Sequence, residues 1–292
     1  MNLFESIFMG ILQGLTEFLP VSSSGHLAIL KNLIGLKDVG LAFDILLHLG
    51  TLIAVFVAFW KDIVELVVNG FGIIGDSVVN VARFFTNIFR GKEDKKEYAD
   101  ILATPYRRFV MLVIVSTIPT AIMGLLMNDA VEAMGRTLLI PGICLLVTGT
   151  LLLIADNMKS GDKDETTVSY PRALFVGICQ GIATLPGISR SGTTITACMG
   201  CGFNREFAVK YSFIMSIPVI LGAAVLEVPD LVGESLGAAE ISSYITGMAF
   251  SAVVGYICIK TMLKVVRNKK FMGFSIYCYA MGILAIVLHF VR

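Results

Sequence analysis

Residues 10–25, GILQGLTEFLPVSSSG, and residues 177–192, GICQGIATLPGISRSG, align without a gap at an offset of 167 residues. Seven aligned positions are identical, and each copy interrupts an apolar stretch with Pro, Gly and Ser. Such a backbone cannot face lipid, because its N–H and C=O groups would lack partners. The two copies therefore predict re-entrant helical hairpins over 3–36 and 172–202, with turns buried in protein near mid-membrane.

The composition indicates a polytopic membrane protein. Of the 292 residues 56% are hydrophobic and 15% charged, and the mean hydropathy is +0.82, which is outside the range of soluble domains. The net charge of +1 is too small to indicate nucleic-acid binding. Six apolar runs are long enough to cross a bilayer. They cover residues 43–60, 109–127, 138–155, 206–227, 243–264 and 272–290.

The charges between these spans predict the orientation of the chain. Residues 61–108 hold eight Lys or Arg, whereas residues 228–242 hold only acidic charges, so the first loop is expected in the cytoplasm and the second outside. The N-terminal hairpin and the C-terminus then lie outside. Residues 69–90 are expected to form an interfacial helix with Arg83 and Arg90 toward the headgroups, and a mobile loop is the alternative.

We expect one integral membrane domain, residues 1–292, built from two repeats. Repeat 1 covers about 1–156 and repeat 2 about 172–292, and each is a re-entrant hairpin followed by three spans. Because three is odd, the second repeat enters the membrane from the opposite side. The predicted fold class is an all-α polytopic membrane protein with two inverted-topology repeats, whose turns can meet at the midplane.

Both turns carry the residues of an anion site. Each Ser-rich turn leads into a new helix, whose free N–H groups and dipole attract negative charge. Arg190 adds a planar guanidinium that suits phosphate oxygens, and a charge at that depth requires a partner or a function. Glu17 is likewise a charge in an apolar segment that requires a partner or a function, and Gln13 lies one turn earlier on the same helix face. Taken alone, the serines could equally be helix N-caps.

His26 follows Ser22 and Ser23 by four and three residues, so it can share their helix face. A hydroxyl, an imidazole, a carboxylate and an Arg in one dry pocket meet the requirements of nucleophilic phosphoryl transfer. A hydrogen-bonded core histidine is the alternative interpretation.

The remaining histidines and the cysteines are interpreted as packing residues. His48 and His289 lie away from both turns, although Asp44 and His48 could instead line the cavity. Of the six cysteines, only Cys198 and Cys201 form a close pair, and no second pair or nearby His completes a zinc site.

QGLTEFLPVSSSGH at 13–26 and LPGISRSGTT at 185–194 resemble the two motifs of the undecaprenyl-diphosphate phosphatase family, the bacitracin-resistance proteins of bacterial membranes. The resemblance implies removal of the terminal phosphate from undecaprenyl diphosphate, which gives the monophosphate carrier recycled in cell-wall synthesis. It also implies six spans with two re-entrant helix pairs, a homodimer, and a pocket that opens to the extracytoplasmic side of the plasma membrane.

Carried over by position, the resemblance places the nucleophile on Ser23, with Ser22 the near alternative, and the other catalytic roles on Glu17, His26 and Arg190. The residues expected to bind the substrate are Ser22, Ser24, Gln13, Ser189, Ser191, Thr193 and Thr194. Many family members have Glu where this chain has Gln13. Any Mg²⁺ or Ca²⁺ would therefore depend on Glu17 and the substrate diphosphate, and no organic cofactor is expected.

In the expected mechanism Ser23 attacks the terminal phosphorus, and Glu17 or His26 accepts its proton. Arg190 and the helix N-termini stabilise the transferring phosphoryl group. Direct attack by an activated water would use the same residues. A lipid-phosphate flippase that uses the same midplane anion site is the alternative function, because inverted repeats with broken helices are a transporter architecture.

Overall fold

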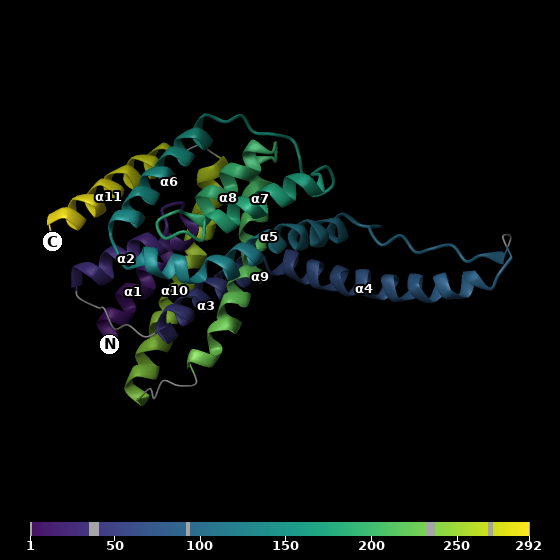
Figure 1. Ribbon diagram of the computed structural model, residues 1–292, viewed down its shortest axis with the longest axis horizontal. Coiled ribbons are helices and arrows are strands. Elements are labelled where there is room, and N and C mark those ends of the chain that lie inside the picture. The colour runs from purple at the N-terminus through teal and green to yellow at the C-terminus, as the bar shows by residue number, and fades with distance from the viewer. Residues whose placement is uncertain (1, 35–40, 92–93, 232–236, 268–270, 292) are drawn as a thin grey trace.

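The computed structural model describes residues 2–34, 41–91, 94–231, 237–267 and 271–291. The regular structure of this part of the chain is helical, apart from one isolated bridge between Lys163 and Phe203. Its helices are α1 (Leu3–Phe18), α2 (Ser23–Ile34), α3 (Leu41–Ala58), α4 (Trp60–Ile88), α5 (Pro105–Gly135), α6 (Leu139–Asn157), α7 (Tyr170–Ile182), α8 (Arg190–Gly200), α9 (Arg205–Leu231), α10 (Ala238–Arg267) and α11 (Met272–Val291). Figure 1 shows them as one bundle from which α4 projects.

Five of the described helices, α5, α6, α9, α10 and α11, are long and apolar enough to cross a membrane. The pair α3 and α4 would make a sixth span, but it is bent by 88°. The prediction of an all-α, multi-pass membrane protein is thus confirmed. The span predicted over 43–60 corresponds to α3, which ends at Ala58, and the other five predicted spans coincide with the five long helices.

The two Ser-rich sequences form helix–turn–helix hairpins, as predicted. Helices α1 and α2 flank the first turn, and α7 and α8 flank the second. These four helices have 11 to 16 residues, so each is about 17 to 24 Å long. A bilayer core is roughly 30 Å thick, so none of the four can cross it alone.

Glycine contacts hold each hairpin against a long helix. A Cβ on Gly10 of α1 would lie 2.2 Å from the carbonyl oxygen of Gly247 in α10, and a Cβ on Gly177 of α7 would lie 2.2 Å from that of Ser116 in α5. The backbones are therefore in direct contact, which is how small residues associate helices in lipid. Gly10 and Gly177 are an aligned pair of the repeated sequence.

Helix α9 packs behind the hairpins and connects them to the rest of the bundle. Phe213 of α9 packs edge-on against Phe18, at the end of α1, with ring centroids 5.3 Å apart, and it also contacts Phe59 after α3. The buried hydroxyl of Tyr211 is hydrogen-bonded to Ser116 of α5. The position of α1 is thus fixed by packing, and α1 carries Gln13 and Glu17 of the candidate site.

An arm leaves the bundle between α3 and α5. Helix α4 has 29 residues, which corresponds to about 43 Å, and residues 94–104 return along it before α5 begins (Figure 1). The helix predicted over 69–90 is confirmed as a helix. It starts earlier, at Trp60, because the apolar pattern continues back to the bend after α3.

Candidate active site

Each turn ends in a serine that caps the helix after it. Ser22 has a φ of +70°, in the left-handed region, and its Oγ accepts a hydrogen bond from the Gly25 N–H at 3.3 Å. In the second turn, Ser189 Oγ accepts a hydrogen bond from the Gly192 N–H at 3.1 Å. Both hydroxyls therefore satisfy a free N–H group in the first helical turn, and they hold the turns in shape.

The two turns touch each other. The N–H of Gly187 donates to Ser24 Oγ at 3.3 Å, and Ser191 Oγ donates to the Leu19 carbonyl at 3.4 Å. There is little space between the backbones, because a Cβ on Gly25 would lie 3.1 Å from the Cα of Gly187. The hairpins thus form one site from segments more than 160 positions apart.

The Glu17 carboxylate connects the first residues of α2 and α8. Ser23 Oγ donates to Oε2 at 2.6 Å, and Arg190 Nη2 donates to Oε1 at 2.6 Å. Gln13 Nε2 also donates to Oε2, at 3.1 Å. The Glu17 side chain is only 5% exposed and that of Arg190 18% exposed. In such a place each charge compensates the desolvation of the other.

This arrangement contains the parts of a phosphoryl-transfer site. The Ser23 hydroxyl is bound to a carboxylate that can accept its proton. Among the described residues, the Arg190 guanidinium has no second hydrogen-bond partner, so its remaining N–H groups can bind phosphate oxygens. Three of the four expected catalytic residues, Ser23, Glu17 and Arg190, are therefore in direct contact.

Comparison with known proteins identifies the family. The family model described as bacitracin resistance protein BacA matches residues 6–284. The chain belongs to the BacA family. It is 40% identical to the undecaprenyl-diphosphatase of Methanosphaera stadtmanae over 99% of this chain and 98% of the relative. It is 39% identical to the protein of the same name from Desulforapulum autotrophicum over the full length of both.

The fourth expected residue of this BacA-family site, His26, lies beside the turn and not against the Ser23 hydroxyl. Its Nδ1 is 2.8 Å from the Ser22 carbonyl oxygen, and its Nε2 is 2.7 Å from the Tyr277 hydroxyl. Because a carbonyl only accepts, Nδ1 carries a proton. The rings of His26 and Tyr277 are stacked, with centroids 5.5 Å apart. Sequence analysis missed Tyr277, because it lies in α11, 251 positions away.

The interpretation of His48 as a packing residue remote from the turns is wrong. Its Nδ1 is 3.1 Å from Gln13 Nε2 and 3.9 Å from the nearer Glu17 oxygen. The packing of α3 beside α1 brings it there, and its half-exposed side chain gives the site an open edge. Asp44, one turn earlier, is instead paired with Lys31 at 2.5 Å.

The threonines that follow Arg190 have different surroundings. Thr194 Oγ1 donates to the Arg190 carbonyl at 2.8 Å and is 2.5 Å from Ser212 Oγ of α9, so it anchors α8. Thr193 Oγ1 is buried and has no hydrogen-bond partner among the described residues. Thr193 aligns with His26 in the repeated sequence.

The protein supplies few ligands for a divalent cation. Both Glu17 oxygens are already engaged, and the described residues contain no group of three His, Cys, Asp or Glu side chains placed to hold a metal. One further acceptor is present, since Gln13 Oε1 is buried without a partner among them. These donors suit a cation only if a ligand adds more oxygens.

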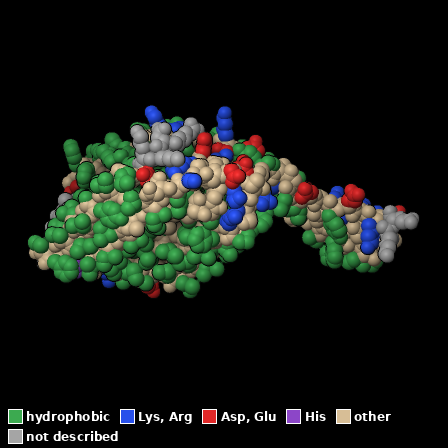
Figure 2. Space-filling view, turned by 90° about the horizontal axis from the view of Figure 1, so that it is seen from above, with side chains coloured by type: hydrophobic (Ala, Val, Ile, Leu, Met, Phe, Trp, Pro, Cys, Tyr) green, Lys and Arg blue, Asp and Glu red, His purple; other side chains and the backbone are tan. Residues whose placement is uncertain are grey.

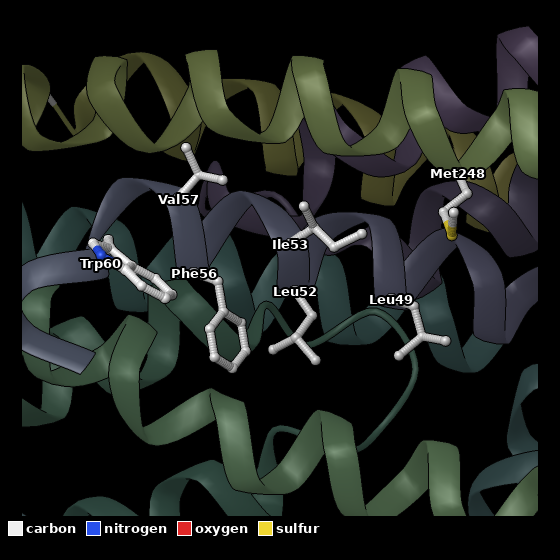
Figure 3. A pocket seen from close by; sticks show the side chains of 7 residues that line it. All are labelled: Leu49, Leu52, Ile53, Phe56, Val57, Trp60 and Met248. Carbon is white, nitrogen blue, oxygen red and sulfur yellow. The ribbon is translucent and has the colours of Figure 1, made fainter. Parts of the chain in front are cut away.

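A pocket of about 530 Å³ opens elsewhere along α3, and Figure 3 shows the side chains that line it. They are Leu49, Leu52, Ile53, Phe56, Val57, Trp60 and Met248. All are apolar in character and none belongs to either turn. The pocket is therefore apolar and is not the catalytic site, although its lining begins one residue after His48.

Proposed function

We propose that this BacA-family protein is an undecaprenyl-diphosphatase. It hydrolyses the terminal phosphate of undecaprenyl diphosphate, which returns the lipid monophosphate to cell-wall synthesis and confers bacitracin resistance. The relatives that match over nearly their whole length bear this name. The observation that carries the proposal is the buried Glu17 carboxylate, which binds the Ser23 hydroxyl and the Arg190 guanidinium at 2.6 Å each.

Ser23 is the nucleophile and Glu17 its base. Ser23 Oγ forms a bond to the terminal phosphorus as its proton passes to Glu17, and the bond from that phosphorus to the bridging oxygen breaks. The lipid monophosphate leaves and takes the proton from Glu17. A water then attacks the phosphoserine as Glu17 accepts its proton, the bond from phosphorus to Ser23 Oγ breaks, and Ser23 takes the proton back from Glu17 as inorganic phosphate leaves. Glu17 is the better base than His26, because only Glu17 is hydrogen-bonded to the Ser23 hydroxyl.

Arg190 and the N-termini of α2 and α8 neutralise the phosphoryl oxygens. The Arg190 guanidinium can keep one N–H on Glu17 while the others bind two phosphate oxygens. Backbone N–H groups at the two turns add donors without side-chain motion. Since these groups are fixed before the substrate arrives, they stabilise the charge that develops in the transition state.

His26 and Gln13 support this machinery. His26 holds the turn through the Ser22 carbonyl, and its Nε2 is hydrogen-bonded to the Tyr277 hydroxyl. In this mechanism the His26 and Tyr277 pair assists the departing phosphate. A Mg²⁺ or Ca²⁺ ion would be held by Glu17, the Gln13 carbonyl oxygen and the diphosphate oxygens of the substrate, where it would neutralise negative charge.

The site also supports two inverted repeats. Ser22 caps Gly25 as Ser189 caps Gly192. A Cβ on Gly25 would meet the second turn at Gly187, and a Cβ on Gly192 would meet the first turn at Pro20. The aligned pairs are Ser22 and Ser189, Gly25 and Gly192, and Pro20 and Gly187, each 167 positions apart. The two turns therefore contact each other through equivalent positions of the repeats. The repeats differ where α2 and α8 begin, with Ser23 in one and Arg190 in the other, so nucleophile and charge stabiliser come from different copies.

The remaining proposals concern the setting of the site. The protein lies in the plasma membrane with both turns re-entrant and with the catalytic cavity open to the extracytoplasmic side. That orientation follows from the basic residues of 61–108, including Lys95, Lys96 and Arg108. Two copies form a homodimer.

The test measures phosphate release from a C55 or C15 prenyl diphosphate by the purified protein in detergent. We expect Ser23→Ala, Glu17→Gln and Arg190→Lys each to lower the rate at least about a hundredfold, a loss of about 3 kcal/mol in transition-state stabilisation. Thr261→Ala is the matched control, because this exposed hydroxyl on α10 has the Ile257 carbonyl, one turn earlier, as its one partner among the described residues.

Acid-quenched samples are then searched by mass spectrometry for phosphoserine. Phosphate on Ser23 supports covalent catalysis, whereas phosphate on Ser22 would transfer the role to the neighbouring hydroxyl. Folded wild type that releases no phosphate with Mg²⁺ or Ca²⁺ present, yet moves prenyl phosphate between the leaflets of liposomes, would make the protein a flippase.

A further inference from the structure

Helix α4 is oriented at a right angle to the spans. Helix α3 runs beside the candidate span α10, as Figure 3 shows. The contacts advance in step along both helices, from Phe43 against Gly247 to the Leu47 carbonyl, which accepts from Ser251 Oγ at 2.9 Å. Since α4 is bent by 88° from α3, it runs within the plane of the membrane.

One face of α4 is covered by the returning chain. Asn87 Nδ2 donates to the Lys96 carbonyl at 2.9 Å and Asn87 Oδ1 accepts from the Lys96 N–H at 2.8 Å. Asn80 makes the same pair of bonds with the backbone of Ala99, at 2.9 and 2.7 Å. Arg83 Nη1, between them, donates to the Glu97 carbonyl. These side chains hydrogen-bond the backbone of residues 96–99, as a neighbouring β-strand would.

The spacing of these contacts fits the two backbones. Seven residues of helix, from Asn80 to Asn87, rise about 10.5 Å. Three residues of extended chain, from Lys96 to Ala99, span about 10 Å. The returning segment therefore lies straight along α4, and the polar face of the helix has its hydrogen bonds satisfied within the arm.

The opposite face of α4 is apolar and bare. Its exposed side chains recur every three or four residues, and they are Trp60, Val64, Val67, Phe71, Ile74, Val78, Val81 and Phe85. Phe71 is 70% exposed and Val78 64% exposed. The charged residues of α4, namely Lys61, Asp62, Glu65, Asp76 and Arg83, all lie off this stripe. A bare apolar surface of this length marks a contact with a membrane or a protein.

The base of the arm is pinned, so its apolar face has a fixed direction. Lys210 of α9 pairs with Asp62 at 2.6 Å, and the Tyr106 hydroxyl donates to Asp62 at 2.9 Å. Further out, Arg107 pairs with Asp76 at 2.5 Å. In Figure 2 the hydrophobic side chains of the arm gather mainly along its lower edge, which continues the hydrophobic surface of the bundle.

We propose that the arm is an interfacial anchor, in which α4 lies on the bilayer with its apolar face among the acyl chains and residues 94–104 toward water. The partner is lipid and not a second α4. A coiled-coil pair would have charges on both flanks of the stripe. Here the flanking positions are 61, 68, 75 and 82 on one side and 63, 70, 77 and 84 on the other, and Lys61 is the one charge among them. Residues 60–104 hold six basic and seven acidic residues, so burial of apolar surface drives the contact and anionic lipid is not required.

The test places a single tryptophan on the arm of the full-length protein in phosphatidylcholine liposomes. Trp60 is the only native tryptophan, so Trp60→Phe gives a clean background. Phe71→Trp and Phe85→Trp report the apolar face, and Glu97→Trp on the returning segment is the matched control. Lipids brominated at different depths along the acyl chain quench the fluorescence of a nearby tryptophan. Phosphate release by each variant confirms that it is folded, because the arm lies outside the catalytic machinery.

We expect blue-shifted emission and at least twofold quenching for Phe71→Trp and Phe85→Trp, strongest with bromines near the headgroup end, and little quenching for Glu97→Trp. Equal quenching at all three positions, or none at any, overturns the proposal. Blue-shifted emission without quenching, lost on dilution of protein in lipid, would show that a second copy covers the face, which also overturns it.

Discussion

The contact between Glu17 and Arg190 predicts a strong coupling in stability. Glu17→Gln leaves the Arg190 guanidinium without an anion, and Arg190→Met leaves the Glu17 carboxylate without a cation, in a place where the two side chains are 5% and 18% exposed. Removal of one partner from a buried ion pair costs about 3 to 5 kcal/mol, because the other charge stays buried and uncompensated. We therefore expect each single variant to be less stable than wild type by about 3 kcal/mol.

The double variant separates this contact from ordinary loss of packing. With both charges removed, no uncompensated charge remains, so Glu17→Gln with Arg190→Met should be no less stable than either single variant. The assay is equilibrium unfolding in detergent for all four proteins, and the coupling energy is the departure from additivity. We expect at least about 2 kcal/mol. If the stability losses of the two single variants add up to the loss of the double variant to within about 0.5 kcal/mol, the reasoning is refuted.

Four further predictions follow from individual contacts. Gly10→Ala should lower the melting temperature in detergent, because its Cβ would lie 2.2 Å from a backbone oxygen of α10. The control is Gly124→Ala, whose Cβ would meet nothing within 4 Å and should leave the melting temperature unchanged. Equal shifts in the two variants would contradict the close approach of α1 and α10. Ser22→Gly should be more stable than Ser22→Ala in the same assay, because both lose the capping hydroxyl but only Gly adopts a φ of +70° without strain. Tyr277→Phe should lower kcat about tenfold with little change in KM, and an unchanged kcat would show that Tyr277 has no role in the reaction. Gln13→Glu should lower the Mg²⁺ concentration needed for half-maximal phosphate release, since it adds a carboxylate beside that of Glu17. An unchanged Mg²⁺ dependence would show that residue 13 does not hold the ion.

The sequence by itself determined the kind of protein and most of the residues at the site. Five of the six predicted spans fall on the five long helices, because lipid allows only helices whose backbone bonds are internal. The predicted bounds match those of α6 and α11 to within two residues, whereas α5, α9 and α10 extend further. The Pro, Gly and Ser interruptions define both hairpins for the same reason. Glu17 and Arg190 stood out because an ionisable group in apolar surroundings requires a partner.

Only the tertiary structure decided which groups touch. The pairing of Glu17 with Ser23 and not with His26 depends on how the first turn bends, and the arrival of Tyr277 depends on the packing of α11. His48 was misjudged because its distance from the turn along the chain says nothing of the packing of α3 beside α1. Local sequence fixes the length and amphipathic face of a helix, but contacts between helices are set by side-chain shape across segments far apart in the chain, and so the catalytic geometry had to come from the fold.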